Sequence, residues 1–416
     1  MIGLKNKRKS LIAIFTTFGI STLAATILFP VLAQIFLAKQ GDFIMQGVPI
    51  NYRGMLLGLF LAVFPFAQFL IGPIMGDYSD KKGRRGIFLF SVLLEAFGYF
   101  LSAVSIHLGM LWLLFLGRMI VGLSAGNTSV CLASVVDISN DEKEKVKYFG
   151  IGSAVIGFMF IVGPLLGGQV SGLFTNPVYA LAMPLWTGAG FALLNFLILF
   201  LFFHETRSEL CSHPFDVLGA VHNIELAFKT LQVRNLYLIY FFFLFSWNML
   251  YQFLPAFLVR DFQMSSIRVG VFGAMFGGVW IIGTLFMQFL TKIVHRMQRI
   301  LFFSLLGISA FSVVAAFSKT IVSFSIAIGL IVFLSGGAWP VFTASISKSS
   351  ENSVQGKVLA LSQSIQSFSM MAAPLLGGIF LHKNGSVPFI MTAISVLFAA
   401  AILVRSGERP FTFNEK

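Results

Sequence analysis

A ten-residue segment with six charged side chains, residues 76–85 (GDYSDKKGRR), divides two long apolar runs, residues 55–75 and 86–103. Charged side chains are costly in hydrocarbon, whereas about twenty consecutive apolar residues are enough to cross a bilayer as a helix. The sequence therefore predicts a tight hairpin between two membrane-spanning helices, with its charges at the membrane surface.

The composition extends this interpretation to the whole chain. Of the 416 residues, 57% are hydrophobic and 11% are charged, whereas soluble proteins carry about 25% charged residues. The net charge of +13 comes from basic residues scattered between apolar runs, which predicts a role in membrane orientation and no nucleic-acid partner. Cys131 and Cys211 suggest neither a disulfide framework nor a metal site. Without a nucleophile–base set or a Walker A motif, we expect no enzyme activity, no cofactor and no metal.

Twelve apolar runs are long enough to span a membrane, so the predicted fold class is an all-α membrane protein. The predicted spans are residues 11–38, 53–75, 86–106, 109–137, 146–172, 179–203, 236–259, 268–291, 300–317, 321–347, 356–382 and 387–404. If the N-terminus is cytoplasmic, 22 of the 29 Lys and Arg residues fall on the cytoplasmic side, six fall outside and Arg118 lies within a span. This positive-inside bias predicts a multi-pass protein of a bacterial inner (plasma) membrane with both termini in the cytoplasm.

The chain also contains an internal repeat. The sequence PLLGG occurs at residues 164–168 in the fifth span and again at residues 374–378 in the eleventh, an offset of 210 residues. An even number of spans separates the copies, so they have the same orientation in the membrane, as in a parallel repeat. We therefore expect two pseudo-symmetric six-helix bundles, residues 1–203 and 236–416, joined by a cytoplasmic linker at residues 204–235.

Four groups of residues occur in order along the first half. They are Gly76, Asp80, Lys81, Gly83, Arg84 and Arg85 in the charged segment; Arg118, Gly122 and Gly126 in the fourth span; Gly150, Gly163, Pro164, Gly167 and Gly168 in the fifth; and His204, Glu205 and Thr206 after the sixth. Together they resemble motifs of the major facilitator superfamily. Residues 72–206 are most similar to tetracycline-type exporters of its drug:proton antiporter family, which implies transport by alternating access.

The charged segment, residues 76–85, is a candidate for a role in conformational change. Gly76 and Gly83 permit positive φ and close approach of the backbone in a short turn. Asp80 is expected to precede the third helix, where a carboxylate can cap free amides or face the positive end of another helix. The resemblance implies that Arg84 pairs with Asp137 and that Asp80 latches the two halves in one access state. The predicted latch consists of Gly76, Asp80, Gly83, Arg84, Arg85 and Asp137. The alternative is a segment that serves orientation and solvation only.

Two charged residues inside predicted spans are candidates for proton coupling. Glu95 and Arg118 each cost about 2.5–3.5 kcal/mol or more in lipid unless they are paired or hydrated. The resembled exporters carry acids where this chain has Ser21, nine residues before Pro30, and Gly98. Because Glu95 lies one helical turn from Gly98, it could replace a missing acid. The alternatives are a static ion pair or a snorkelling carboxyl for Glu95, and a structural hydrogen-bond donor for Arg118.

The glycines and prolines near the repeat predict close helix packing. They are Gly150, Gly163, Pro164, Gly167 and Gly168 in the fifth span and Pro374, Gly377 and Gly378 in the eleventh. The glycine that the family motif has four residues before Gly163 is Met159 here. This departure weakens the distinction between an antiporter and an uptake symporter.

Polar side chains on the spans predicted to be central are candidates for a substrate cavity. They are Gln34, Asn127, Trp247, Asn248, Gln252, Gln363 and Gln366. The tryptophans could equally be interfacial anchors. We expect a monomeric, proton-coupled exporter of a drug-like or secreted small molecule in a lipid bilayer. The few acids in its spans favour neutral, zwitterionic or anionic substrates. An uptake symporter and a non-transporting receptor on the same fold remain alternatives.

Overall fold

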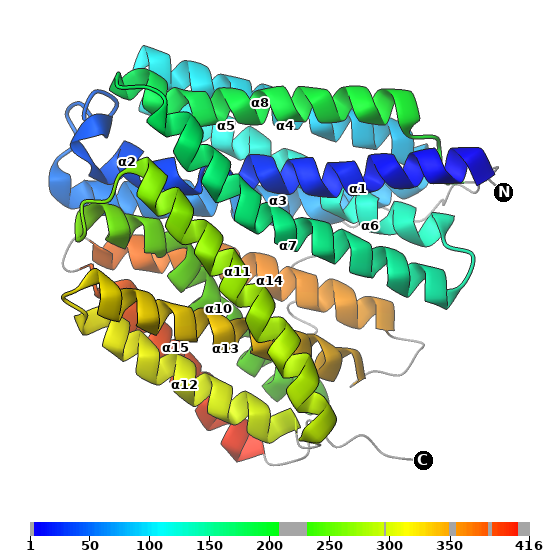
Figure 1. Ribbon diagram of the computed structural model, residues 1–416. Helices are drawn as coiled ribbons and strands as arrows, with labels where there is room; N and C mark the ends of the chain where they lie inside the picture. The colour runs from blue at the N-terminus through cyan, green and yellow to red at the C-terminus, as the bar shows by residue number, and fades with distance from the viewer. Residues whose placement is uncertain (1–3, 208–230, 295–296, 349–354, 382–384, 407–416) are drawn as a thin grey trace. The chain divides into compact units, whose positions relative to one another are not determined.

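The computed structural model describes residues 4–207, 231–294, 297–348, 355–381 and 385–406, and these residues form helices without strands (Figure 1). The helices are α1 (Leu4–Thr26), α2 (Phe29–Leu37), η1 (Lys39–Gly41), α3 (Ile50–Lys82), α4 (Arg84–Leu108), α5 (Leu111–Ser124), α6 (Asn127–Ile138), α7 (Glu142–Gly172), α8 (Pro177–Phe202), α10 (Leu231–Arg260), α11 (Ser266–Ile293), α12 (Met297–Phe317), α13 (Ile321–Lys348), α14 (Gln355–Leu381) and α15 (Val387–Ser406).

Among these residues, twelve helical segments are long and apolar enough to cross a membrane, which confirms the predicted number of spans. The first span consists of α1 and α2, and the fourth consists of α5 and α6. The first break falls just before Pro30, at the start of α2, where a proline is tolerated because the first amides of a helix need no partner within it. The second break falls at Ala125 and Gly126.

The helices cluster into two compact units. One contains the described parts of Met1–Val48, Val63–Gly219 and Met264–Ala274, and the other those of Pro49–Ala62, Ala220–Gln263 and Met275–Lys416. Most of the predicted linker, residues 208–230, lies outside the described residues. The division into two six-helix bundles joined by residues 204–235 stays a prediction.

In the first unit, α4 packs against α5 and α8, and α1 packs against α7 and α8 (Figure 1). A buried apolar cluster ties the N-terminal part of α4 to the end of α8, with the rings of Phe88 and Phe203 edge to face at 5.2 Å. Aromatic pairs of this geometry stabilise a core by about 0.5–1.5 kcal/mol beyond the burial of their area. The cluster therefore fixes the chain that follows α8 beside the start of α4.

Glycines of α7 allow close packing within the first unit. A Cβ added to Gly163 would meet Thr26 Oγ1, and one added to Gly167 would meet the Ile27 carbonyl. A Cβ on Gly168 would lie 2.6 Å from the Ser266 carbonyl, in the first turn of α11. By contrast, Gly150 has no described atom within 4 Å of its Cβ position. Three of the predicted packing glycines of this helix are thus closely packed, and Gly150 is not.

The repeat copy in α14 is closely packed within the second unit. A Cβ on Gly377 would meet the Phe253 ring, and one on Gly378 would lie 2.6 Å from the Gly58 Cα. Pro374 lies inside α14, as Pro164 lies inside α7. Related residues of the two sequence repeats therefore occupy similar close-packed positions in the two units.

A pair of α7 variants tests this packing. Gly167→Ala is expected to destabilise the protein by about 1–3 kcal/mol, because its methyl group collides with the backbone of Ile27. Gly150→Ala is the matched control, and it should be neutral or stabilising by about 0.5–1 kcal/mol, because alanine favours a helix more than glycine does. Thermal unfolding of the two variants in detergent would measure the difference. Equal midpoints would contradict the packing role of Gly167.

Candidate functional site

The predicted charged hairpin is shorter than its sequence suggested. Helix α3 continues through the charged residues to Lys82, and α4 begins at Arg84, so the turn consists of Gly83 alone. Gly83 has φ +94°, which only glycine adopts readily, as expected. The expectation for Gly76 was wrong, because it lies inside α3 without positive φ and has no described atom within 4 Å of its Cβ position. A helix that extends its polar last turns beyond the bilayer keeps its backbone hydrogen bonds, which accounts for the difference.

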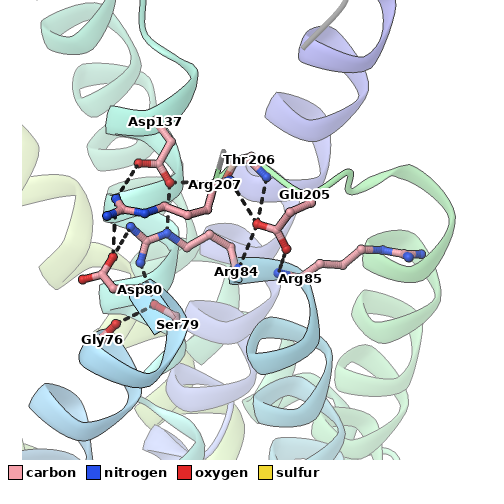
Figure 2. A network of polar contacts seen from close by, with 9 residues as sticks. All are labelled: Gly76, Ser79, Asp80, Arg84, Arg85, Asp137, Glu205, Thr206 and Arg207. Carbon is pink, nitrogen blue, oxygen red and sulfur yellow. Dashed lines mark hydrogen bonds and ion pairs between the residues drawn. The ribbon is translucent and has the colours of Figure 1, made fainter. Parts of the chain in front are cut away.

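Arg84 is the centre of a polar network at this turn (Figure 2). Its buried guanidinium lies 2.6 Å from Asp80 Oδ1 and 2.9 Å from Asp137 Oδ2, and it donates a 2.6 Å hydrogen bond to Ser79 Oγ. The contact between Arg84 and Asp137 that the family resemblance implied is therefore present. Because Arg84 is only 3% exposed, it depends on these partners to compensate for its lost hydration.

The segment after α8 completes the network. Arg207 Nη1 lies 3.6 Å from Asp80 Oδ1 and 3.7 Å from Asp137 Oδ1, and Thr206 donates a 3.3 Å hydrogen bond to Asp137 Oδ2. Two arginines thus face two aspartates drawn from α3 and α6. We refer to Ser79, Asp80, Arg84, Asp137, Glu205, Thr206 and Arg207 as the Arg84 network.

Glu205 caps the first turn of α4. Its carboxylate accepts hydrogen bonds from the backbone amides of Arg84 at 2.9 Å and Arg85 at 3.0 Å (Figure 2). Asp80 does precede α4, the helix of the third span, but the expectation that it caps this helix was wrong, because Asp80 lies in the last turn of α3 and pairs with Arg84. A Cβ on Gly83 would lie 2.7 Å from Glu205 Oε2, so glycine also leaves room for this cap.

The charge on Glu205 is favoured by this geometry. Partial burial opposes ionisation, but the amides of Arg85, Arg207, Arg84 and Thr206 all donate to the carboxylate, and the net result is a lowered pKa. Arg85 contributes only its backbone. Its guanidinium points away from the network in Figure 2 and donates a 3.0 Å hydrogen bond to the Phe200 carbonyl.

Glu205→Ala is expected to destabilise the protein by about 1 kcal/mol, the typical effect of losing a helix cap. Because the folded-state pKa of Glu205 lies below its ordinary value of 4.5, its stabilising effect should be complete above about pH 4.5 and fade as the pH falls through the folded-state pKa. Thermal unfolding at several pH values would measure this. Asp77→Asn, which removes an i,i+4 pair with Lys81, is the control and should have little effect. A difference between wild type and Glu205→Ala that persists well below the folded-state pKa would contradict a role for the ionised carboxylate.

Glu95 forms a second polar cluster inside the first unit. It is buried near the middle of α4, where Ser21 Oγ donates a 2.9 Å hydrogen bond to its Oε2. Asn127 Nδ2 lies 3.5 Å from the same oxygen and 3.2 Å from Ser21 Oγ. The structure therefore brings Glu95 to Ser21, the position at which the resembled exporters carry an acid. Side chains from α1, α4 and α6 meet here.

The neighbouring Gly98 position leaves no space for an acid. A Cβ on Gly98 would lie 2.8 Å from the Val121 amide nitrogen and 3.0 Å from the Gly117 carbonyl, where α4 crosses α5. The acidic side chain one turn earlier, that of Glu95, is directed to α1 and α6 instead. Arg118 of α5 is half-buried, with its guanidinium 4.7 Å from the centre of the Phe64 ring, a cation–π geometry.

The predicted cavity residues are distributed over both units. Asn127 belongs to the Glu95 cluster, and the side-chain oxygen of buried Gln34 has no hydrogen-bond partner among the described residues. In the second unit, Asn248 donates a 2.8 Å hydrogen bond to the Leu244 carbonyl, and Gln252 donates one of 3.2 Å to the Met370 carbonyl. Gln363 is exposed and Gln366 is half-buried on α14, and Trp247 is half-buried on α10.

Comparisons with known proteins place these features in a family. A model of the Major Facilitator Superfamily matches residues 14–335 and 236–414. The chain is 27% identical over 341 residues to the class B tetracycline resistance protein of Escherichia coli, covering 80% of each chain. A 201-residue match at 30% identity to the class H protein of Pasteurella multocida spans about half of each chain, 48% of this one and 46% of that one.

A second resistance protein and a solved transporter structure are also similar to this chain. The quinolone resistance protein NorA of Staphylococcus aureus (strain MRSA252) is 24% identical over 360 residues, which cover 85% of this chain and 88% of NorA. The crystal structure of the human organic anion transporter MFSD10 (TETRAN) has the same fold, with a TM-score of 0.68 at 22% identity over 95% of this chain and 99% of that chain. Since the family model covers nearly all of the twelve spans and the fold agrees, the chain belongs to the Major Facilitator Superfamily and is a multi-pass membrane transporter.

Proposed function

We propose that this protein exports small amphipathic molecules in exchange for protons. The observation that carries the proposal is a buried carboxyl group, Glu95, held between Ser21 and Asn127 at mid-span in a transporter. The direction of transport is supported by its similarity to tetracycline and quinolone resistance proteins. Orientation with both termini in the cytoplasm is supported by the 22 Lys and Arg residues assigned to that side.

In this proposal, Glu95 carries the proton. When Glu95 is ionised, Ser21 and Asn127 donate to it and offset part of its desolvation. When it is protonated, the carboxyl hydroxyl can donate to Ser21 Oγ, because a serine hydroxyl both donates and accepts. The cluster can therefore hold either protonation state with a hydrogen bond, which a group that loads and releases a proton during transport requires. Arg118 supports coupling as a fixed positive charge in the same unit.

The Arg84 network holds the cytoplasmic ends of α3, α4 and α6 and the segment after α8 in one arrangement. Its ion pairs are short and its central arginine is buried, so this arrangement breaks only with the loss of several charge-assisted contacts at once. We propose that it acts as the latch of one access state. Gly83 forms the turn between α3 and α4, and Arg85 contributes to the latch through its backbone amide alone.

The substrate proposed here is neutral, zwitterionic or anionic, because the sequence from residue 236 to 404 contains only two acidic residues, Asp261 and Glu351. The polar residues proposed to contact it are Gln34, Asn127, Trp247, Asn248, Gln252, Gln363 and Gln366. The unpaired oxygen of Gln34 supports its part in this set. The transporter is proposed to act as a monomer.

The proposal is tested by drug accumulation in bacteria that express the protein. Tetracycline or a quinolone should accumulate less than in control cells, and a protonophore should abolish the difference. Higher accumulation would indicate uptake, and unchanged accumulation of every compound in a broad panel would contradict export.

Asp80→Asn, present in the membrane at wild-type level, should export several-fold more slowly, because it loses the 2.6 Å ion pair with Arg84. A wild-type export rate in Asp80→Asn would contradict the proposal that the Arg84 network is a latch.

A further inference from the structure

Three of the five tryptophans of the chain converge in the second unit. They are Trp247 of α10, Trp280 of α11 and Trp339 of α13. The ring centres of Trp247 and Trp280 are 4.1 Å apart, and those of Trp280 and Trp339 are 5.8 Å apart. Tyr251 stacks on Trp247 at 6.1 Å. We refer to the three indoles as the tryptophan cluster.

Two members of the tryptophan cluster, Trp247 and Trp280, lie at an unusual depth for tryptophan side chains. Trp247 lies midway along the span Arg234–Arg260, and Trp280 lies near the middle of Ser266–Thr291. Tryptophan in membrane proteins is enriched at the two interfaces, where the indole N–H meets water or head groups. Interfacial anchoring therefore does not explain Trp247 or Trp280.

Small residues hold the cluster in place. A Cβ on Gly336 would lie 2.6 Å from the Trp280 carbonyl, and Thr284 donates a 2.9 Å hydrogen bond to the Gly336 carbonyl. These contacts fix α11 against α13 one turn from Trp339. A second close approach occurs where a Cβ on Gly283 would meet the Phe333 carbonyl. The relative positions of Trp280 and Trp339 are thus set by backbone contacts as well as by their rings.

The indole N–H groups of the cluster have no partner within the described part of the chain. Each of the three side chains is only half-buried. By comparison, Trp186 of the first unit donates a 3.1 Å hydrogen bond to His107 Nε2. An indole N–H that is removed from water usually finds an acceptor, so these N–H groups, two of them at mid-span, are suited to an acceptor supplied from outside the chain.

The charge of the surroundings narrows the choice of ligand. Among the described residues of α10, α11 and α13 no acid occurs, and the nearest acid in sequence, Asp261, follows the end of α10. No carboxylate in these helices would compensate a desolvated cation. Aromatic faces with N–H donors fit a flat aromatic ring system that carries carbonyl or phenolate oxygens.

We propose that the tryptophan cluster binds the planar aromatic part of a neutral or anionic, oxygen-bearing substrate. The rings of Trp247 and Trp280 supply the stacking surface, and the indole N–H groups supply donors to the substrate oxygens. This inference rests on the proposed export function and names the substrate class of its binding site.

Intrinsic fluorescence tests this site directly. In the double variant Trp112→Phe, Trp186→Phe, only the tryptophan cluster emits, and the probe is 2-naphthoate added to the purified protein in detergent. Saturable quenching is expected, and Trp247→Leu in the same background should weaken binding about tenfold. Trp247→Phe keeps an aromatic ring and should retain most of the affinity, which separates a stacking role from misfolding.

Two further probes test the ligand class. Decanoate, an aliphatic anion, and ethidium, a planar aromatic cation, should each bind at least about tenfold more weakly than 2-naphthoate. Equal affinity for either one, or an unchanged affinity for 2-naphthoate in Trp247→Leu, would overturn the inference. A different result would contradict the proposed function: wild-type protein that shows no protonophore-sensitive export in cells. Intact export by Trp247→Leu of every aromatic compound that the wild type exports would overturn this inference alone.

Discussion

Glu95→Gln is expected to lose pH-gradient-driven transport almost completely while still binding substrate. Glutamine has nearly the same shape and can still accept a hydrogen bond from Ser21, so the packing of α1, α4 and α6 should persist. It cannot take up or release a proton, so a gradient of protons no longer drives the cycle. The measurement is substrate movement in proteoliposomes with an imposed pH gradient, compared with exchange of substrate at equal pH on both sides.

The exchange experiment is the internal control for this prediction. Glu95→Gln should exchange labelled for unlabelled substrate at a rate near that of the wild type, because exchange at equal pH needs no net proton transfer. Ser21→Ala removes a hydrogen-bond donor but keeps the carboxyl group, so it should slow gradient-driven transport only several-fold. Full gradient-driven transport by Glu95→Gln would rule out proton carriage by this residue.

Arg84→Gln is expected to destabilise the protein by about 3 kcal/mol and to reduce transport more than tenfold. The change leaves Asp137, which is 13% exposed, with the more distant Arg207 as its one cationic partner among the described residues. Removing one member of a buried ion pair typically costs about 3–5 kcal/mol, because the remaining charge stays desolvated. Thermal unfolding in detergent and transport in proteoliposomes measure the two effects.

The adjacent residue provides a matched control. Arg85→Gln removes the same charge next to the same turn, but among the described residues its half-buried guanidinium contacts the Phe200 carbonyl and ring and no carboxylate. We expect it to change stability by no more than about 1 kcal/mol and to leave transport near the wild-type rate. If both variants were equally impaired, the loss would come from positive charge at the membrane surface and not from the Arg84 network.

Spans and local motifs were predictable because they depend on neighbours in sequence. Apolar runs predicted the twelve spans, and Gly83 predicted the positive φ of the turn. The partner of Arg84 was predictable only through family resemblance, since Asp137 lies 53 residues away. The helical extension of α3 to Lys82 was missed because charge suggested a loop, although charged residues form helices readily outside the bilayer.

The roles of Glu205 and Ser21 were beyond sequence reasoning for a different reason. Glu205 caps a helix that begins 121 residues earlier, and a cap supplied by a distant segment leaves no local spacing to recognise. Its signal in the sequence was its place in the motif His204, Glu205 and Thr206 after the sixth span, which does not reveal the helix that it caps. Glu95 was identified from its cost in lipid, but its contact with Ser21 depends on how α1 and α4 pack. The lack of space beside Gly98, where α4 crosses α5, became evident only in three dimensions.

Simultaneous recording of internal pH and substrate in proteoliposomes tests proton exchange through Glu95 most directly. With equal pH on both sides, a substrate gradient imposed on the wild-type protein should drive protons in the opposite direction. The same gradient imposed on Glu95→Gln should move no protons. Proton movement in the same direction as the substrate, or equal proton movement by the two proteins, would contradict antiport carried by Glu95.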